Sequence, residues 1–141
     1  MHAQQMLATH PDARREARGG PSKALVAAIE AAYDCAQACS ACADACVAEA
    51  DPALVQCIRM NLDCADVCYT AGVVATRRAG SNETVVTGLL MLCEALCRDC
   101  AAECGRHAQH MEHCRICAEV CRRCEAACRD ARVGAAPEQV Q

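Results

Sequence analysis

The sequence predicts an all-α fold: an antiparallel, up-down-up-down four-helix bundle with a Cys-lined core, plus a short N-terminal arm. Cysteines recur at alternating intervals of four and three residues, which places them along one face of an α-helix. Capping residues, prolines and glycines divide the chain into four such segments, and their short connections favour antiparallel neighbours. At 141 residues, the chain is long enough for one domain with one core.

The repeated motif is CxxxCxxCxxxC, and the chain contains it three times in full. A fourth segment, CIRMNLDCADVC, keeps the frame but carries Asn61 where one cysteine would stand. Alternating intervals of four and three are the a/d pattern of a bundle core, so we expect the cysteines to face inward as metal ligands. The sixteen are Cys35, Cys39, Cys42, Cys46, Cys57, Cys64, Cys68, Cys93, Cys97, Cys100, Cys104, Cys114, Cys117, Cys121, Cys124 and Cys128.

The first two helices are predicted from capping residues. Ser22 is suited to the N-cap of a first helix that runs to about Ala50. Asp51 is expected to cap the second helix, with Pro52 at its first position, and Gly80 closes it.

The third and fourth helices follow the same reasoning. Ser81 or Asn82 is expected to cap the third, which ends near Gly105. The fourth begins between residues 108 and 112 without a clear cap and ends before Gly134.

The domain organisation follows from these limits. Residues 1–21 are expected to form a flexible arm with room for one short helix, because they contain Pro11 and a Gly-Gly pair. Residues 22–133 form the bundle, and residues 134–141 form a disordered tail.

Composition and charge exclude several classes of function. The formal charge of −4 provides no field that would attract nucleic acid or an anionic membrane. The first twenty residues contain no apolar run of the export type, and no stretch approaches the roughly 20 apolar residues of a membrane span. We therefore expect a cytoplasmic protein whose thiols stay reduced. No general base, nucleophile elbow or phosphate loop is present, so the sequence predicts no enzyme.

The cysteine pattern points to a soft metal ion. Neighbouring residues of a stripe have Cβ atoms about 5–6 Å apart, whereas a disulfide needs about 3.5–4.5 Å. Zinc sites use closed sets of four ligands, and iron–sulfur clusters use loop-type spacings. A continuous thiolate lining suits several Cu(I) ions, on the order of ten per chain, which neighbouring sulfurs can share. Zinc binding, iron–sulfur binding and a thiol redox buffer remain the alternatives.

The two ends of the bundle are expected to differ. Aliphatic side chains plug one end: Leu25, Ala28, Ile29, Ala32, Val74, Val86, Leu89 and Leu90. The opposite end collects Cys46, Cys57, Cys104 and Cys114 beside the segment GRHAQHMEH. In that segment His107, His110, Met111 and His113 are candidate copper ligands, and we predict a mouth there through which metal enters and leaves. A polar interhelical loop is one alternative, and a zinc knuckle of Cys100, Cys104, His113 and Cys117 is another.

These features together resemble the cytosolic branch of the bacterial copper storage proteins. The resemblance rests on the CxxxC pairs of all four helices and on the histidine-bearing loop before the last one, and it covers about residues 22–132. It implies a homotetramer that holds many Cu(I) ions on its cysteines and exchanges copper with a cytosolic copper chaperone or a copper-requiring protein. The departure is Asn61, which either coordinates metal or forms hydrogen bonds near the mouth, or is a neutral interruption of the stripe.

A second apolar stripe is consistent with burial between subunits and equally with packing around the flank of the core. It consists of Leu54, Ile58 and Leu62 on the second helix and Leu92 and Leu96 on the third.

Overall fold

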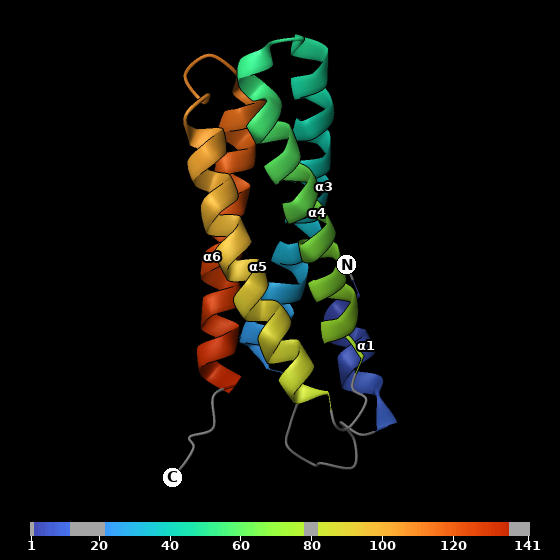
Figure 1. Cartoon of the computed structure of the whole chain (residues 1–141). Helices are drawn as coiled ribbons and strands as arrows, with labels where there is room; N and C mark the ends of the chain where they lie inside the picture. Colours follow the sequence, from blue (N-terminus) through green and yellow to red (C-terminus); the bar gives the residue numbers. More distant parts are fainter. Residues whose placement is uncertain (1, 12–21, 78–81, 136–141) are drawn as a thin grey trace.

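The computed structural model describes residues 2–11, 22–77 and 82–135 and shows the predicted bundle of four long helices (Figure 1). Their bounds are α3 (Lys23–Glu49), α4 (Val55–Ala75), α5 (Glu83–Gly105) and α6 (Glu112–Ala135). Figure 1 shows that the α3–α4 and α5–α6 connections lie at the same end of the bundle, as an up-down-up-down order requires. None of the described helices is long and apolar enough to cross a membrane.

The limits of α3 and α4 follow from local bonds. The backbone N–H of Leu25 donates to the Ser22 side chain over 3.2 Å, which confirms Ser22 as the N-cap of α3. The helix ends at Glu49, because Ala50 adopts the left-handed conformation at φ 56°. The Asp51 side chain accepts a hydrogen bond from Ala53, but it heads a short 3-10 turn over Pro52–Leu54 and not α4 itself.

The later helix ends differ slightly from expectation. Asn82 precedes α5, but its side chain donates to the backbone oxygen of Arg77 over 2.7 Å and does not cap the helix. Helix α6 continues through Gly134 to Ala135, so the predicted end before Gly134 is wrong. One glycine costs a helix only about 1 kcal/mol, which does not stop it. Residues 78–81, with the predicted signals at Ser81 and Gly80, and residues 136–141 lie outside the described residues.

The N-terminal arm is partly docked on the bundle. Residues Ala3–Thr9 form the short helix α1, and its Ala3 and Leu7 are buried against Ile29 and Ala75. Figure 1 shows α1 beside the end of the bundle that lies opposite the two connections. The short helix for which the sequence left room is therefore present, and its docking is an addition to the prediction: a four-residue interval gives α1 an apolar side that the bundle covers.

The aliphatic end is built largely as predicted, although Val74 is only half-buried and does not belong to either apolar cluster. Ala28, Ile29, Ala32 and Leu90 are buried there. Leu25, Val86 and Leu89 pack against these residues and are only partly buried. Beyond this apolar layer the interior is lined mainly by cysteine side chains.

Candidate metal centre

All sixteen cysteines are buried free thiols that project into the core from the four helices. Neighbouring Sγ atoms lie between 3.4 Å and 4.0 Å apart, within helices and across them. These gaps are much longer than the roughly 2.05 Å of a disulfide. They suit an ion bound to two sulfurs, since each bond from a thiolate to such a metal measures about 2.3 Å.

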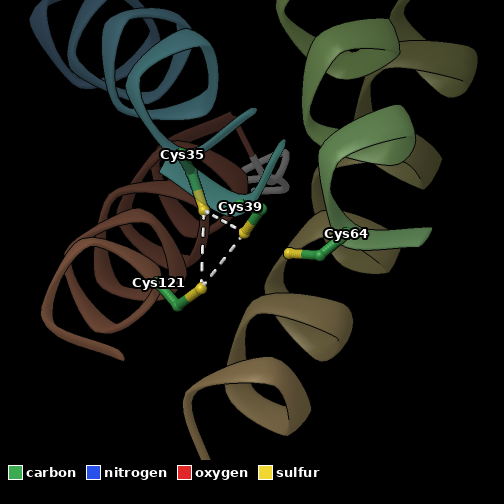
Figure 2. A group of neighbouring side chains, drawn as sticks. All are labelled: Cys35, Cys39, Cys64 and Cys121. Carbon is green, nitrogen blue, oxygen red and sulfur yellow. Dashed lines mark hydrogen bonds between the residues drawn. The ribbon is translucent and has the colours of Figure 1, made fainter. Parts of the chain in front are cut away.

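The middle of the core shows the arrangement most clearly (Figure 2). The Sγ atoms of Cys35 and Cys39 on α3 lie 3.7 Å and 3.6 Å from that of Cys121 on α6, and 3.8 Å from each other. Cys64 points toward them from α4, and all four sulfurs lie within 4.8 Å of one another. Three of the four helices thus contribute sulfur to one group.

The network continues toward the aliphatic end. The Sγ atom of Cys68 lies 3.4 Å from that of Cys93 and 3.5 Å from that of Cys97. Cys93 is 3.8 Å from Cys124, and Cys124 is 3.9 Å from Cys128. These contacts join the sulfurs of the middle and of the aliphatic end into one network, whereas Cys42, Cys46 and Cys114 form a separate cluster at the mouth and Cys57 pairs with Cys104.

Asn61 lies inside this network. Its side chain is fully buried, and its Oδ1 atom accepts hydrogen bonds from Cys100 over 3.0 Å, Cys117 over 3.3 Å and Cys104 over 3.5 Å. Its Nδ2 atom donates to Cys57 over 3.7 Å. A buried amide needs partners, and here neighbouring thiols supply them. Of the two interpretations of Asn61, the structure shows the one in which the side chain forms hydrogen bonds and is not a neutral interruption.

His113 brings nitrogen into the predicted mouth. Its Nδ1 atom lies 3.4 Å from Sγ of Cys42 and 3.6 Å from Sγ of Cys114. These atoms and Sγ of Cys46 lie within 4.8 Å of one another. On the other side of the ring, Nε2 lies 3.0 Å from a carboxylate oxygen of Glu49.

His107 is placed differently. Its Nε2 atom lies 3.4 Å from a carboxylate oxygen of Glu103, and Arg106 donates to the other oxygen over 2.7 Å. Glu103 is a buried carboxylate that the sequence analysis missed. Its spacing of three and four residues from Arg106 and His107, which follow the end of α5, is a signal that could have identified it. The Glu49–His113 contact joins residues 64 apart and has no such signal.

The two remaining candidates are at the edge of the mouth. Met111 is partly buried and packs against the cysteine core. His110 is exposed in the connection between α5 and α6. The suggested zinc knuckle is not assembled as a separate unit, because Cys100 and Cys117 bond Asn61 while His113 faces Cys42.

The electrostatics of the mouth are set by burial and by neighbouring thiols. Burial raises the pKa of Cys46 to about 12, and Cys42 adds to the rise. The pKa of Cys42 is lowered to about 6 by a hydrogen bond from Cys104, with further help from Cys57 and His113, against the effects of Cys117 and burial. Burial lowers the pKa of His113, but its bonds to Cys42 and Glu49 outweigh this and leave that pKa raised. The mouth thus holds one thiol that readily becomes a thiolate beside others that stay protonated.

Known proteins with this arrangement bind copper. A solved structure of the copper storage protein Ccsp from Streptomyces lividans, loaded with 10 copper equivalents, superimposes with a TM-score of 0.84 and is 41% identical, over 94% of this chain and 98% of that one. A structure of the cytosolic copper storage protein from the same organism with five coppers gives a TM-score of 0.75 at 45% identity, over 79% of this chain and 94% of that one.

Sequence comparisons point the same way. An uncharacterized cysteine-rich protein of Bacillus subtilis (strain 168), YhjQ, is 35% identical over 94 residues, which is 66% of this chain and 82% of that protein. The family model described as copper storage protein matches residues 22–133. The chain therefore belongs to the copper storage protein family.

Proposed function

We propose that this protein stores Cu(I) in the cytosol, bound by the thiolates of its sixteen cysteines, and that it catalyses no reaction. The observation that carries the proposal is the set of closely spaced buried sulfurs that fills the core, with neighbouring Sγ atoms 3.4–4.0 Å apart. Thiolate ligands select Cu(I), and a bridging ion can be shared between neighbouring sulfurs.

The way the sulfur groups overlap favours Cu(I) over zinc. Cys39 belongs to one group with Cys35 and Cys64 and to another with Cys100 and Cys117, and Cys121 belongs to both groups. A structural zinc ion takes four ligands of its own. Because both groups contain Cys39 and Cys121, they cannot supply two zinc ions with four separate sulfurs each. Ions that need fewer sulfurs each can occupy the whole series.

An anaerobic titration of the fully reduced protein with Cu(I) tests the proposal, in competition with a chromogenic Cu(I) chelator and with a parallel count of reactive thiols. We expect each chain to withhold on the order of ten ions before the chelator takes up copper. Withholding of two ions or fewer would contradict storage, and reconstitution with zinc and with iron and sulfide would then be compared. Turnover of a redox substrate would contradict the absence of catalysis.

The mouth is proposed to be the end at which copper enters and leaves. His113 lies against Cys42 and Cys114, Met111 packs on the core, and His107 and His110 lie in the adjoining segment. Replacing the three histidines by alanine should change the rates of loading and of removal by the chelator and leave most of the capacity in place. Unchanged rates would contradict this role.

A homotetramer is proposed, as the family resemblance implies, and exposed apolar residues support a contact surface between its chains. The exposures of Val55, Leu62 and Tyr69, seven residues apart along α4, are 52%, 49% and 59%. Tyr69 meets Tyr33 of α3 edge to face with ring centroids 6.1 Å apart, so this row lies beside α3. Val47 of α3 is 60% exposed. Exposed apolar residues that recur on one face of a helix are typical of a surface that another chain covers.

Only part of the apolar stripe predicted from the sequence is exposed in the structure. Leu62 and Leu92 are exposed, but Leu54 is fully buried, and Ile58 and Leu96 pack against the core. Replacing Leu62 and Tyr69 together by glutamate should therefore reduce the assembly to smaller species, measured by light scattering during gel filtration. A tetramer that survives this double change would contradict an interface on this row.

The exchange partner is proposed to be a cytosolic copper chaperone or a copper-requiring protein. Transfer of copper from the loaded protein to a purified cytosolic chaperone, followed by separation of the two, tests this. Transfer no faster than passive release into the free chelator would contradict a direct partner.

A further inference from the structure

The pair formed by Glu49 and His113 does little for stability and has a defined geometry. The Glu49 and His113 side chains are 41% and 25% exposed, and exposed pairs of this kind contribute little to folding. Glu49 is also the last residue of α3, where a negative charge opposes the helix dipole. Because neither folding stability nor the helix dipole favours a glutamate at this position, its presence calls for a functional explanation.

The hydrogen bond to Glu49 determines which ring nitrogen of His113 faces the sulfurs as an acceptor. An ionised carboxylate can only accept, so the Nε2 atom 3.0 Å away must carry the proton. In a neutral imidazole the other nitrogen then holds a free lone pair. That nitrogen is Nδ1, and it lies 3.4 Å from Sγ of Cys42 and 3.6 Å from Sγ of Cys114.

We propose that Glu49 is a positioning residue that keeps His113 in the Nε2–H tautomer, so that Nδ1 completes a mixed sulfur–nitrogen copper site with Cys42, Cys46 and Cys114. The proposal rests on the copper-storage function. Metal-binding histidines commonly donate their second ring N–H to a carboxylate, and loss of that carboxylate costs about 10–100-fold in metal affinity. Glu49 reaches the site from α3, whereas His113 belongs to α6, so the contact also fixes the ring relative to both helices.

The first test needs no copper. The tautomer of His113 is read from the imidazole ¹⁵N shifts of the reduced, metal-free protein in mildly alkaline solution, with His113→Asn to assign the signals. We expect Nε2–H in the unchanged protein and in Glu49→Gln, whose amide oxygen can also accept from Nε2. Glu49→Leu removes the acceptor and should shift the population toward Nδ1–H. The matched control is Glu119→Leu, which removes a surface carboxylate paired with Arg115.

The second test measures copper. The copper ion bound at His113 is identified as the one whose binding is lost in His113→Asn. For this ion, Glu49→Leu should lower the affinity, measured in competition with the chelator, about tenfold. Glu49→Gln and Glu119→Leu should leave that affinity within about twofold of the unchanged protein. Adding Glu49→Leu to His113→Asn should have no further effect, because both act on one ligand.

The outcomes separate the two proposals. The role of Glu49 would be overturned by an unchanged His113 tautomer in Glu49→Leu, or by an equal loss of copper affinity in Glu119→Leu. Either result would count against this role even if the protein stores copper. Failure to withhold copper in the unchanged protein would overturn the storage function, while the tautomer measurement would still report on the Glu49–His113 contact.

Discussion

At the scale of single residues, the core shows how much one substitution in a repeat can change. Asn61 occupies a cysteine position, is fully buried, and serves as acceptor for three thiols and donor to a fourth. The sequence could locate this departure, since the CxxxC frame marks it. It could not choose between a bonded and a neutral asparagine, because the partners come from two other helices and from Cys57 one turn away.

Replacing Asn61 by cysteine should complete the fourth copy of the motif and raise the copper capacity by about one ion per chain. The metal-free protein should lose about 1 kcal/mol of unfolding free energy, since the thiols of Cys100, Cys104 and Cys117 lose their oxygen acceptor. Chelator competition measures the first effect, and urea denaturation measures the second.

The control for that change is Asn61→Leu, which has a similar side-chain size and no sulfur. Its capacity should equal that of the unchanged protein. A capacity gain in the leucine variant as well would show that the asparagine blocks metal and does not merely replace a ligand.

At the scale of helices, periodic apolar spacing predicted the four long elements, and local chemistry predicted most of their ends. Ser22 caps α3, and α5 ends at Gly105, as the sequence indicated. The docking of α1 could not be predicted in this way. A helix of seven residues has too few turns to show a period, and its position depends on Ile29 and Ala75, which are distant in the sequence.

The docking of α1 predicts a clear effect of Leu7→Asp. Leu7 is fully buried, so a charge there should detach α1 at a cost of about 2 kcal/mol in lost apolar burial. Limited proteolysis should then cut residues 2–11 faster, while copper capacity stays unchanged, because α1 lies at the aliphatic end.

Met6→Asp is the matched control on the same helix, since Met6 is 62% exposed. It should leave the proteolysis rate of this segment as it is. Equal protection of α1 in the Leu7→Asp protein would mean that the helix is held by contacts other than Leu7.

At the scale of the whole molecule, a core of thiols links folding to protonation. Burial raises the pKa of Cys46 to about 12 and also raises the pKa of Cys114. An unfolded chain releases these protons near pH 8.5, the usual value for cysteine. Below roughly pH 8.5 both states hold the protons, and above it the unfolded state alone loses them.

The free energy of unfolding of the reduced, metal-free protein should therefore fall as pH rises between about 8.5 and 12. The slope approaches at most about 1.4 kcal/mol per pH unit for each such thiol. Urea denaturation under anaerobic conditions measures it. Helical circular dichroism near neutral pH should be the same with and without copper, since the four amphipathic helices form the bundle before metal fills it.

Copper-loaded protein provides the comparison. Its sulfurs have already given up their protons, so loading should release roughly one proton per thiolate formed. The free energy of unfolding should therefore fall much less with rising pH in the copper-loaded protein than in the metal-free protein. Stability that rises with pH between about 8.5 and 12 in the metal-free state would contradict the raised pKa of Cys46 and Cys114.

The aliphatic layer at one end of the core, overlaid by α1, has a consequence for the age of the stored ions. For a core that fills and empties only at the end near His113, an ion that reaches the sulfurs around Cys93 and Cys124 can leave only after those nearer the opening have moved. The newest copper is then exchanged first, and the oldest persists. Position along the bundle axis, more than differences in affinity, would divide the contents into a rapidly renewed pool and a long-lived reserve.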